Sequence, residues 1–251
     1  MIGYDRCLNS QFLVGCGAGY THTDFKWNES AGSGKIQQVY GGLYGSYSNC
    51  FINLNLSTMV GENFYDLKRK IAFNSPSRPN SSVNESAHSH YNGFEWTSRF
   101  GIIGSLKKLS IPLQVLANVD YFYLNQNRFR ESGATGINLD VREKISNMLQ
   151  TETGMTYIPT FSFDGGCLSP YLGLSYLAKI PLSSSIYRAN FINQSGTFTS
   201  NTTSKAINFV VPYLGLKAMK DDGFSFLLNA KAELNGYIKD YVVDCRFDYS
   251  F

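Results

Sequence analysis

Three histidines are the side chains whose type and spacing could support catalysis or metal binding in this chain of 251 residues. His22 and Asp24 stand two positions apart, so on a strand they share one face, where the carboxylate could orient the imidazole as a base. His88 and His90 have the same spacing and could supply two ligands to a metal ion. All three lie in predicted loops or outer strand ends, and no G-x-S-x-G nucleophile turn accompanies them. We therefore predict solvated histidines, no enzymatic activity, no cofactor and no metal site.

The five cysteines offer a second kind of chemistry, because an odd number leaves at least one thiol unpaired. Their spacing matches no zinc-binding pattern. Cys7 and Cys50 fall in neighbouring predicted turns, and an oxidising compartment would permit a disulfide between them. The alternative, in which the cysteines stay unpaired, is left open by the sequence.

The strands that must position these groups are clearest at the C-terminal end, in residues 241–251. Successive side chains of a strand point to opposite faces. One face of this stretch is polar, and the other carries Tyr241, Val243, Cys245, Phe247, Tyr249 and Phe251. The alternation continues to a final aromatic residue, whereas most chain ends are polar and frayed. This ending resembles the assembly signal of bacterial outer-membrane β-barrels, and we assign that role to Phe247, Tyr249 and Phe251.

The same alternation recurs along the chain and predicts eleven strands, most of about ten to sixteen residues. They cover residues 1–6, 11–26, 36–47, 50–65, 92–104, 111–127, 144–161, 168–182, 205–220, 224–235 and 241–251. Tilted strands need about nine to eleven residues to cross a bilayer, whereas strands of soluble sheets have about five or six. The mean hydropathy of −0.18 is that of a soluble protein, but it does not argue against a membrane barrel, because only alternate residues of such a barrel face lipid.

Connections between the predicted strands alternate between short and long. The short ones are residues 7–10, 48–49, 105–110, 162–166 and 221–223, and the long polar ones are residues 28–35, 68–90, 128–142 and 183–204. Outer-membrane barrels have short periplasmic turns and longer outside loops. We therefore predict an all-β fold, a transmembrane antiparallel up-and-down β-barrel in the bacterial outer membrane. In the alternative, a soluble β-sandwich, the same Leu, Phe and Tyr side chains would be buried between two sheets.

The strand count predicts that one strand is missing. In an antiparallel meander of eleven strands, the first and last run the same way and cannot pair antiparallel. An open edge in lipid would leave backbone groups unpaired at a cost of several kcal/mol each. Residues 1–7 also lack the basic start and apolar core of a signal peptide. We therefore expect residues 1–251 to be one N-terminally truncated domain of a twelve-stranded barrel, without its first strand, its signal peptide or any preceding domain.

Small and polar side chains lie opposite the apolar faces, and we predict that they line a hydrated lumen. They are Gly15, Gly17, Gly19, Glu152, Lys231, Glu233 and Arg246. Glycine on an inner face lets a barrel curve tightly or leaves room inside it. Two interpretations stay open, because these residues could hold a segment in the lumen or could only solvate and brace the wall. Lysine and arginine (22) nearly balance aspartate and glutamate (19), so no nucleic-acid partner is indicated.

Short motifs in the predicted strands resemble those of the autotransporter (type V secretion) β-domain, a twelve-stranded barrel. Residues 4–6 and 13–21 (YDR and LVGCGAGYT) resemble its DYR and LGxALGYS strands, and residues 39–47 (VYGGLYGSY) resemble its LGLYGGY strand. Residues 121–134, with Phe129 and the run ESGA, are similar to its Y…F-x-E-S-G-A segment. Residues 149–154 (LQTETG) resemble LRSELG, and residues 169–173 (SPYLG) resemble PYxxLGW without the usual charged residue after it. The cysteine and asparagine content suggests the chlamydial branch, including its polymorphic outer-membrane proteins.

The resemblance implies a translocator and outer-membrane anchor that helps to export and display an N-terminal passenger. Its expected partners are outer-membrane lipid, the barrel-assembly machinery through the C-terminal strand, and the protein's own passenger segment in the pore. The alternative function is an outer-membrane barrel whose long outside loops act as an adhesin or a hydrolase. The sequence does not identify the passenger or what it binds.

Overall fold

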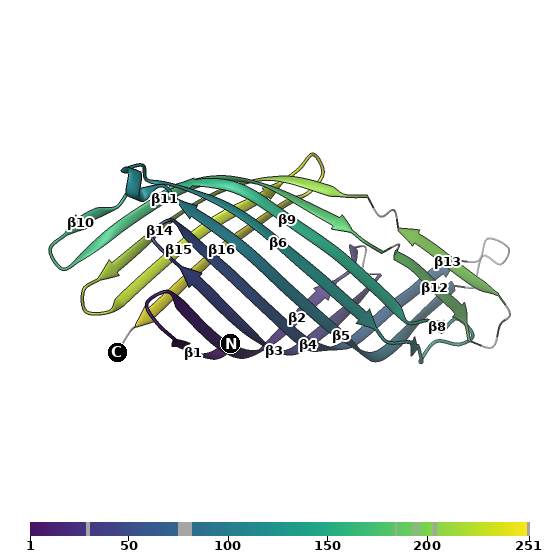
Figure 1. The fold of residues 1–251 in the computed structure, drawn as a ribbon. Coiled ribbons are helices and arrows are strands. Elements are labelled where there is room, and N and C mark those ends of the chain that lie inside the picture. The colour runs from purple at the N-terminus through teal and green to yellow at the C-terminus, as the bar shows by residue number, and fades with distance from the viewer. Residues whose placement is uncertain are drawn as a thin grey trace.

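The computed structural model describes residues 1–28, 31–74, 82–183, 185–192, 194, 196–202 and 205–249. Almost all of them belong to antiparallel strands, which form one large curved sheet and one small sheet beside its end (Figure 1). In spatial order the large sheet contains β1 (Ile2–Cys7), β2 (Phe12–Lys26), β3 (Gly32–Ser48), β4 (Ile52–Asn74), β5 (Ser82–Ser105), β6 (Leu113–Gln126), β9 (Lys144–Tyr157), β11 (Gly166–Pro181), β14 (Ile207–Lys220), β15 (Phe224–Leu234) and β16 (Lys239–Tyr249). A further strand, β10 (Phe161–Phe163), joins them by pairing with β11 alone. The predicted all-β, up-and-down topology of eleven strands is thus confirmed.

Side-chain exposure alternates along the large sheet, as the sequence predicts. On β2, Phe12, Val14 and Tyr20 are exposed on the outer face, whereas Gly15 and Gly19 lie half-buried on the inner face. The outer face of the other strands carries exposed apolar side chains, among them Leu43, Leu56, Phe100, Val119, Met155, Leu174, Leu214, Leu228 and Val243. Within the described residues, the cluster of buried apolar side chains is small and consists of Leu177, Phe209 and Val211. The sandwich alternative is therefore wrong, because in the described part of the chain the apolar side chains of the outer face are exposed and not buried between two sheets.

The hairpin of β4 and β5 extends far beyond the neighbouring strands, and this corrects one prediction. Residues 68–90 were expected to form a long polar loop, but β4 and β5 stay paired from Ile52 opposite Gly104 to Asn74 opposite Ser82. Residues 75–81, at the tip, lie outside the described residues. The polar composition indicates an environment without lipid on either face, and backbone pairing alone can continue a strand there.

A small sheet replaces two other predicted loops, over residues 128–142 and 183–204. Its strands are β13 (Thr197–Thr202), β12 (Ser185–Phe191), β8 (Leu139–Val141) and β7 (Phe129–Arg130), in this spatial order. The central pairing joins β12 to β8, so the sheet combines segments that lie far apart in the sequence. β7 and β8, with two and three residues, are too short for a periodic pattern to reveal them.

The short connections lie together at the opposite end of the large sheet, on the left of Figure 1. Asn9 forms one turn by accepting hydrogen bonds on Oδ1 from the backbone N–H groups of Gln11 (2.8 Å) and Phe12 (2.9 Å). Asn49 forms the next turn in the same way. Such local bonds are the reason that asparagine favours turns.

The strand predicted over residues 144–161 ends early, because β9 stops at Tyr157. Pro159 follows, and proline has no N–H to donate to a strand ladder. The chain resumes strand structure in β10 and turns at Gly165, whose φ of 86° lies in the left-handed region that favours glycine.

The two edges of the large sheet are β1 and β16, which run in the same direction because ten antiparallel pairings separate them. Neither edge has a second neighbour within the described residues, so the sheet is an open half-barrel rather than a closed ring. The described part of the chain contains no helix long and apolar enough to cross a membrane.

Candidate functional site

Hydrogen-bonded carboxylates cover the inner wall of the large sheet, which is the candidate functional surface. The most buried is Asp120 on β6, with a relative exposure of 1%. Arg99 on β5 donates to it twice, from Nε to Oδ1 at 2.5 Å and from Nη2 to Oδ2 at 3.0 Å. Gln150 on β9 donates to the same Oδ2 at 3.3 Å. One carboxylate therefore links three adjacent strands.

Two other glutamates on the inner wall repeat this arrangement. Glu95 on β5 accepts from Gln38 on β3 at 3.0 Å and from Asn63 on β4 at 3.2 Å. Glu152 on β9 accepts from the Ser175 hydroxyl on β11 at 2.6 Å, and the Asn118 amide on β6 lies 3.5 Å from its other oxygen. Both carboxylates thus receive donors from other strands, up to two strands away for Glu95, which links the strands of the wall to one another.

Lys231 and Glu233, also predicted to face the lumen, contact each other on the inner face of β15. Their charged groups are 3.5 Å apart, and Lys179 of β11 approaches the other oxygen of Glu233 to 2.6 Å. Glu233 is buried, with 9% relative exposure. The structure thus brings Glu152, Lys231 and Glu233 onto one wall and gives each a protein partner. Their contact with a passenger stays a prediction.

The predicted lumen glycines of β2 also lie on the inner face, and two of them are covered by tyrosine rings of β3. A Cβ atom built on Gly15 would lie 2.4 Å from Cζ of Tyr44, and one on Gly19 would lie 2.4 Å from Cζ of Tyr40. Only a residue without a side chain fits beneath these rings. Gly17 is different, because the nearest atom to its added Cβ is a backbone oxygen at 3.4 Å.

Arg246, the last predicted lumen residue, lies on the edge strand β16. It is exposed, and its Nε donates to Asp248 Oδ1 on the same strand at 2.8 Å. The preceding inner residue, Asp244, accepts from Asn229 of β15 at 2.9 Å. The inner face of β16 thus continues the polar wall, but with more exposed ion pairs than the centre of the sheet.

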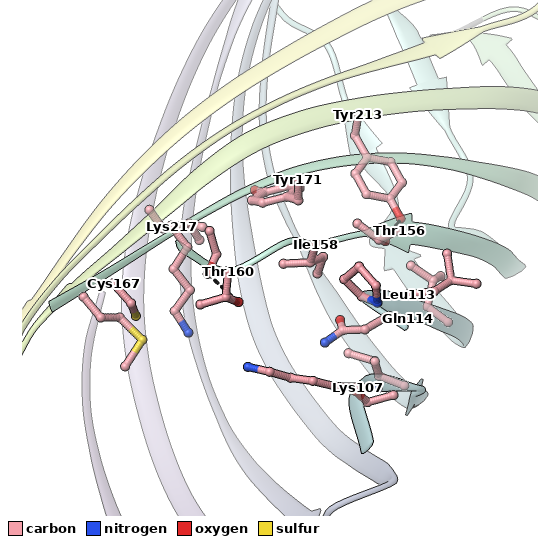
Figure 2. Close-up of a pocket in the computed structure, with 17 residues that line it drawn as sticks. Lys107, Leu113, Gln114, Thr156, Ile158, Thr160, Cys167, Tyr171, Tyr213 and Lys217 are labelled. Atoms are coloured by element: carbon pink, nitrogen blue, oxygen red, sulfur yellow. Dashed lines mark hydrogen bonds between the residues drawn. The ribbon is translucent and has the colours of Figure 1, made fainter. Parts of the chain in front are cut away.

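A hollow of about 600 Å³ opens on the inner wall at the short-turn end (Figure 2). Ile158 contributes apolar surface, whereas Tyr171 and Tyr213 contribute phenol groups. Figure 2 shows the ammonium groups of Lys107 and Lys217 directed into the same space. The described lining contains no carboxylate, so the two lysines give this hollow a positive charge.

A buried ion pair holds the small sheet against the β4–β5 hairpin at the long-loop end. Glu131, with 8% relative exposure, accepts from Arg69 Nε at 2.9 Å and Nη2 at 2.5 Å, and from the backbone N–H of Leu139 at 2.9 Å. Tyr91 stacks between Tyr65 and Phe129, with ring centroids 4.6 and 4.2 Å away. The family motif around Glu131 was a signal for this contact, but nothing in the sequence identified Arg69 as the partner.

A second ion cluster stiffens the small sheet itself. Asp140 on β8 accepts from Arg128 Nε at 2.8 Å and from Arg130 Nε at 3.1 Å. These bonds, above all those from Arg128, hold the pKa of the Asp140 carboxyl below its ordinary value of 3.8. Two ion pairs therefore hold the segment that carries the family motif: Arg69–Glu131 joins it to the hairpin, and Arg128–Asp140 lies within the small sheet.

Two of the histidines each contact a carboxylate on the outer face of the large sheet, one on β2 and one between β5 and β4. His22 Nε2 lies 2.9 Å from Asp24 Oδ2, which confirms that they share a face, and His90 Nδ1 lies 3.5 Å from Asp66 Oδ1. His88 lies two residues before His90 on the same strand, and its backbone N–H and C=O groups pair with those of Ser132. Among the described residues no three His, Cys, Asp or Glu side chains group as metal ligands would.

All five thiols are free in the structure, so the disulfide considered between Cys7 and Cys50 is not formed. Cys7 ends β1 and Cys50 lies in the turn after β3, with β2 between the two strands. Two strand spacings amount to about 9.5 Å, whereas disulfides require Cα atoms within about 7 Å. The register of the sheet therefore separates the two turns too far.

The described part of the predicted assembly signal lies on the outer face of β16. Phe247 and Tyr249 are exposed and stand opposite Phe226 and Phe224 of β15. Phe251 lies outside the described residues. The outward aromatic row of the last strand is thus present, and its role in assembly stays a prediction.

Comparison with known proteins identifies the family of this chain. Residues 1–231 match the model of the autotransporter beta-domain. A search of curated proteins finds no match. The fold is similar to the translocator domain of autotransporter NalP from Neisseria meningitidis, with a TM-score of 0.71 and 14% identity over 99% of this chain and 77% of that one. It is also similar to the beta domain of the Bordetella autotransporter BrkA, with a TM-score of 0.59 and 16% identity over 98% of this chain and 85% of that one.

A more distant likeness is to the toluene transporter TbuX of Ralstonia pickettii, with a TM-score of 0.54 and 8% identity over 90% of this chain and 67% of that one. At these identities the structures show the fold, whereas the family match rests on the sequence itself. The suggested chlamydial branch stays a prediction. An apolar outer face and a polar inner wall are what an integral outer-membrane barrel requires. The chain therefore belongs to the autotransporter β-domain family, and it is an outer-membrane translocator and anchor that supports passenger export.

Proposed function

We propose that the inner wall guides a segment of the protein's own passenger through the barrel, and that the barrel itself performs no catalysis. The observation that carries this proposal is the wall of hydrogen-bonded carboxylates, in which Asp120, Glu152 and Glu233 each receive donors from other strands of the sheet. Such a surface is polar, but its carboxylates already have hydrogen-bond donors within the protein. It therefore suits a segment that must slide past it rather than a substrate that must be held.

The hollow at the short-turn end is the proposed point of contact with that segment. Lys107 and Lys217 supply two positive charges beside apolar surface that includes Ile158 and Leu116. A passenger segment with acidic and apolar side chains on one face would match both features. Short turns face the periplasm in outer-membrane barrels, so the contact would lie where export begins.

We further propose that one extended strand closes the ring between β1 and β16. These edges run in the same direction, so a single strand antiparallel to both can pair with each of them. Closure would satisfy the backbone groups that lipid cannot. The proposed barrel then has twelve strands, with residues 1–251 providing eleven of them.

The C-terminal strand is the proposed recognition element for the barrel-assembly machinery. Its outward aromatic row, which includes Phe247 and Tyr249, remains accessible on an edge strand until the ring closes. An exposed edge offers unpaired N–H and C=O groups to an additional strand. The same row would contact lipid once the barrel is inserted.

Site-specific photo-crosslinking tests the export proposal. A crosslinking residue replaces Lys217 in the hollow, or Leu214 on the outer face of the same strand, in a barrel that carries a reporter passenger stalled by a folded block. We expect the passenger to crosslink to position 217 and not to position 214, where the side chain is 58% exposed toward lipid. Equal crosslinking at both positions, or none at position 217 while the stalled passenger is surface-detectable, would contradict passage along the inner wall.

A further inference from the structure

The long-loop end of the large sheet is covered on its lumen side. Ala87 of β5 lies on the inner face there, because it stands an even number of positions from Glu95 on a strand that pairs without a break. Ala87 is 1% exposed, and Val141 and Ala189 of the small sheet are 1% and 0% exposed. These are the three most buried apolar side chains among the described residues. A lumen open to water would leave inner-face side chains accessible, so another part of the chain covers them at this end.

The segment that carries the family motif supplies part of this cover. Arg69 stands directly opposite Ala87 in the β4–β5 pairing, so its side chain also lies on the inner face. Glu131 pairs with this guanidinium and is 8% exposed. The next residue, Ser132, exchanges two backbone hydrogen bonds with His88 of β5, at 2.8 and 2.9 Å. The motif therefore contacts the hairpin both through a buried ion pair and through the backbone.

The two small residues of the motif continue this close fit. Gly133 has a φ of 99°, in the left-handed region that favours glycine. A Cβ atom on it would lie 3.0 Å from the backbone oxygen of Ser86 in the hairpin. Ala134 is 7% exposed, and the following residue, Thr135, donates its backbone N–H to Glu85 Oε2 at 2.6 Å. Each residue of the motif thus either contacts the hairpin or is buried.

Tyr187 of β12 extends the cover towards β9. Lys144 lies on the inner face of β9, an even number of positions from Glu152, and its Nζ is 6.0 Å from the centroid of the Tyr187 ring. Burial raises the pKa of the Tyr187 phenol, and the nearby Glu131 carboxylate raises it further. In the large sheet, β5 and β6 separate β9 from β4, which carries Arg69. Tyr187 therefore lies between inner faces that two strands separate, and the small sheet leans over the lumen.

We propose that the small sheet narrows the exit of the lumen, and that residues 131–134 hold it in this position. The small sheet lies at the end opposite to the short turns, where a passenger would leave (Figure 1). A buried ion pair, two backbone hydrogen bonds and the stack of Tyr91 on Phe129 make it a fixed part of the exit. An extended passenger can pass beside it, whereas a folded domain is held back here. This inference rests on the proposed passage through the lumen.

Export of a reporter passenger, with or without a small cysteine-free folded domain as a block, tests the proposal in cells that make the full protein. Arg69→Glu sets a second carboxylate against Glu131, and loss of a buried ion pair should lower the ratio of docked to undocked sheet by at least about 100-fold. The matched control is Lys70→Glu, the same charge change at the next position, where the side chain is exposed on the outer face. Protease accessibility of a tag placed behind the block measures completed export.

We expect the blocked passenger to complete export several-fold more often in Arg69→Glu than in the wild type or in Lys70→Glu. The unblocked passenger should be exported equally by all three proteins, which also shows that each barrel has assembled. Equal arrest of the blocked passenger in the three proteins would overturn the proposal, as would equal release in both variants. Failure of the proposed function would differ from this, because the stalled passenger would then not crosslink to position 217.

A reversible lock tests the same point with milder substitutions, should Arg69→Glu fail to assemble. The variant combines Glu131→Gln, which removes the buried charge and keeps the shape of the side chain, with His88→Cys and Ser132→Cys. The last two positions form a hydrogen-bonded pair, whose Cα atoms are about 5.5 Å apart and within the range of a disulfide. None of the five native thiols lies on β4, β5 or the small sheet. The blocked passenger should pass under reducing conditions and stop once the disulfide forms; the same arrest in both states would contradict the proposal.

Discussion

Removal of the Arg99 side chain tests whether buried carboxylates hold the barrel wall together. Asp120 is 1% exposed and receives two hydrogen bonds from Arg99 and one from Gln150. In Arg99→Leu the carboxylate stays at the centre of three strands with a single neutral donor at 3.3 Å. The variant should therefore unfold more easily than the wild type.

The expected loss can be estimated from the burial of the two partners. Removal of one partner of a buried ion pair costs about 3–5 kcal/mol, because an uncompensated charge is left behind. The side chain of Arg99 is 52% exposed, so water in the lumen can solvate part of the site. We therefore expect the lower end of the range, about 3 kcal/mol of unfolding free energy.

Urea unfolding in neutral detergent micelles, followed by tryptophan fluorescence, measures this loss. Arg99→Leu combined with Asp120→Leu should recover most of it, because an apolar pair of similar volume replaces a buried ion pair at little cost. Arg246→Leu is the matched control on the same inner face, since its side chain is 70% exposed and its pair with Asp248 contributes about 0–1 kcal/mol. The reasoning is refuted if Arg99→Leu is as stable as the control, or if the double variant is no more stable than the single one.

Three further predictions follow from the geometry of single residues. Gly15→Ala should lower the folded fraction in heat-modifiability gels, because its Cβ would lie 2.4 Å from the Tyr44 ring and overpacking costs about 1–3 kcal/mol. The control Gly17→Ala should fold normally, because the nearest atom to its Cβ is 3.4 Å away. The pKa of Asp140 is lowered in the folded protein, so this carboxylate contributes its full stabilising free energy to the small sheet above about pH 4 and loses it as the pH falls through the lowered pKa. Proteolysis should therefore cut the small sheet faster in strong acid, and Asp140→Asn should remove that pH dependence. Phe247→Ser should reduce barrel assembly in cells but not refolding in micelles; equal loss in both assays would place the defect in folding instead.

The outer face was predictable because lipid imposes one simple rule on it. Every second residue of β16, from Tyr241 to Tyr249, had to be apolar, and the same holds for β11 from Leu172 to Ile180. Strand pairing then followed from chain order, because each long strand pairs with the next one. The sequence also predicted the inner face, since the same period places Glu152 and Glu233 opposite the apolar residues.

The parts outside the membrane were harder to predict, because no lipid selects their pattern. The β4–β5 hairpin continues through residues such as Asn84 and Ser86, whose polarity is typical of a loop. The small sheet depends on pairings such as Ala189 opposite Val141, which join distant segments. The partner of Glu131 was unpredictable for the same reason, because Arg69 lies 62 residues earlier in the sequence.

The pairing of the inner charges decides how strongly the wall can hold a moving segment. A free carboxylate at Glu152 or Glu233 would attract each passing cation, and a translocating chain would pause there. Because Ser175 donates to Glu152 and Lys179 to Glu233, both carboxylates already have partners within the wall when a segment slides by. The exception is the hollow with Lys107 and Lys217, whose charges stay open at the short-turn end. Passage requires binding that is firm enough for entry and weak enough for release; in the route we propose, a charged hollow comes first and a wall of hydrogen-bonded carboxylates follows.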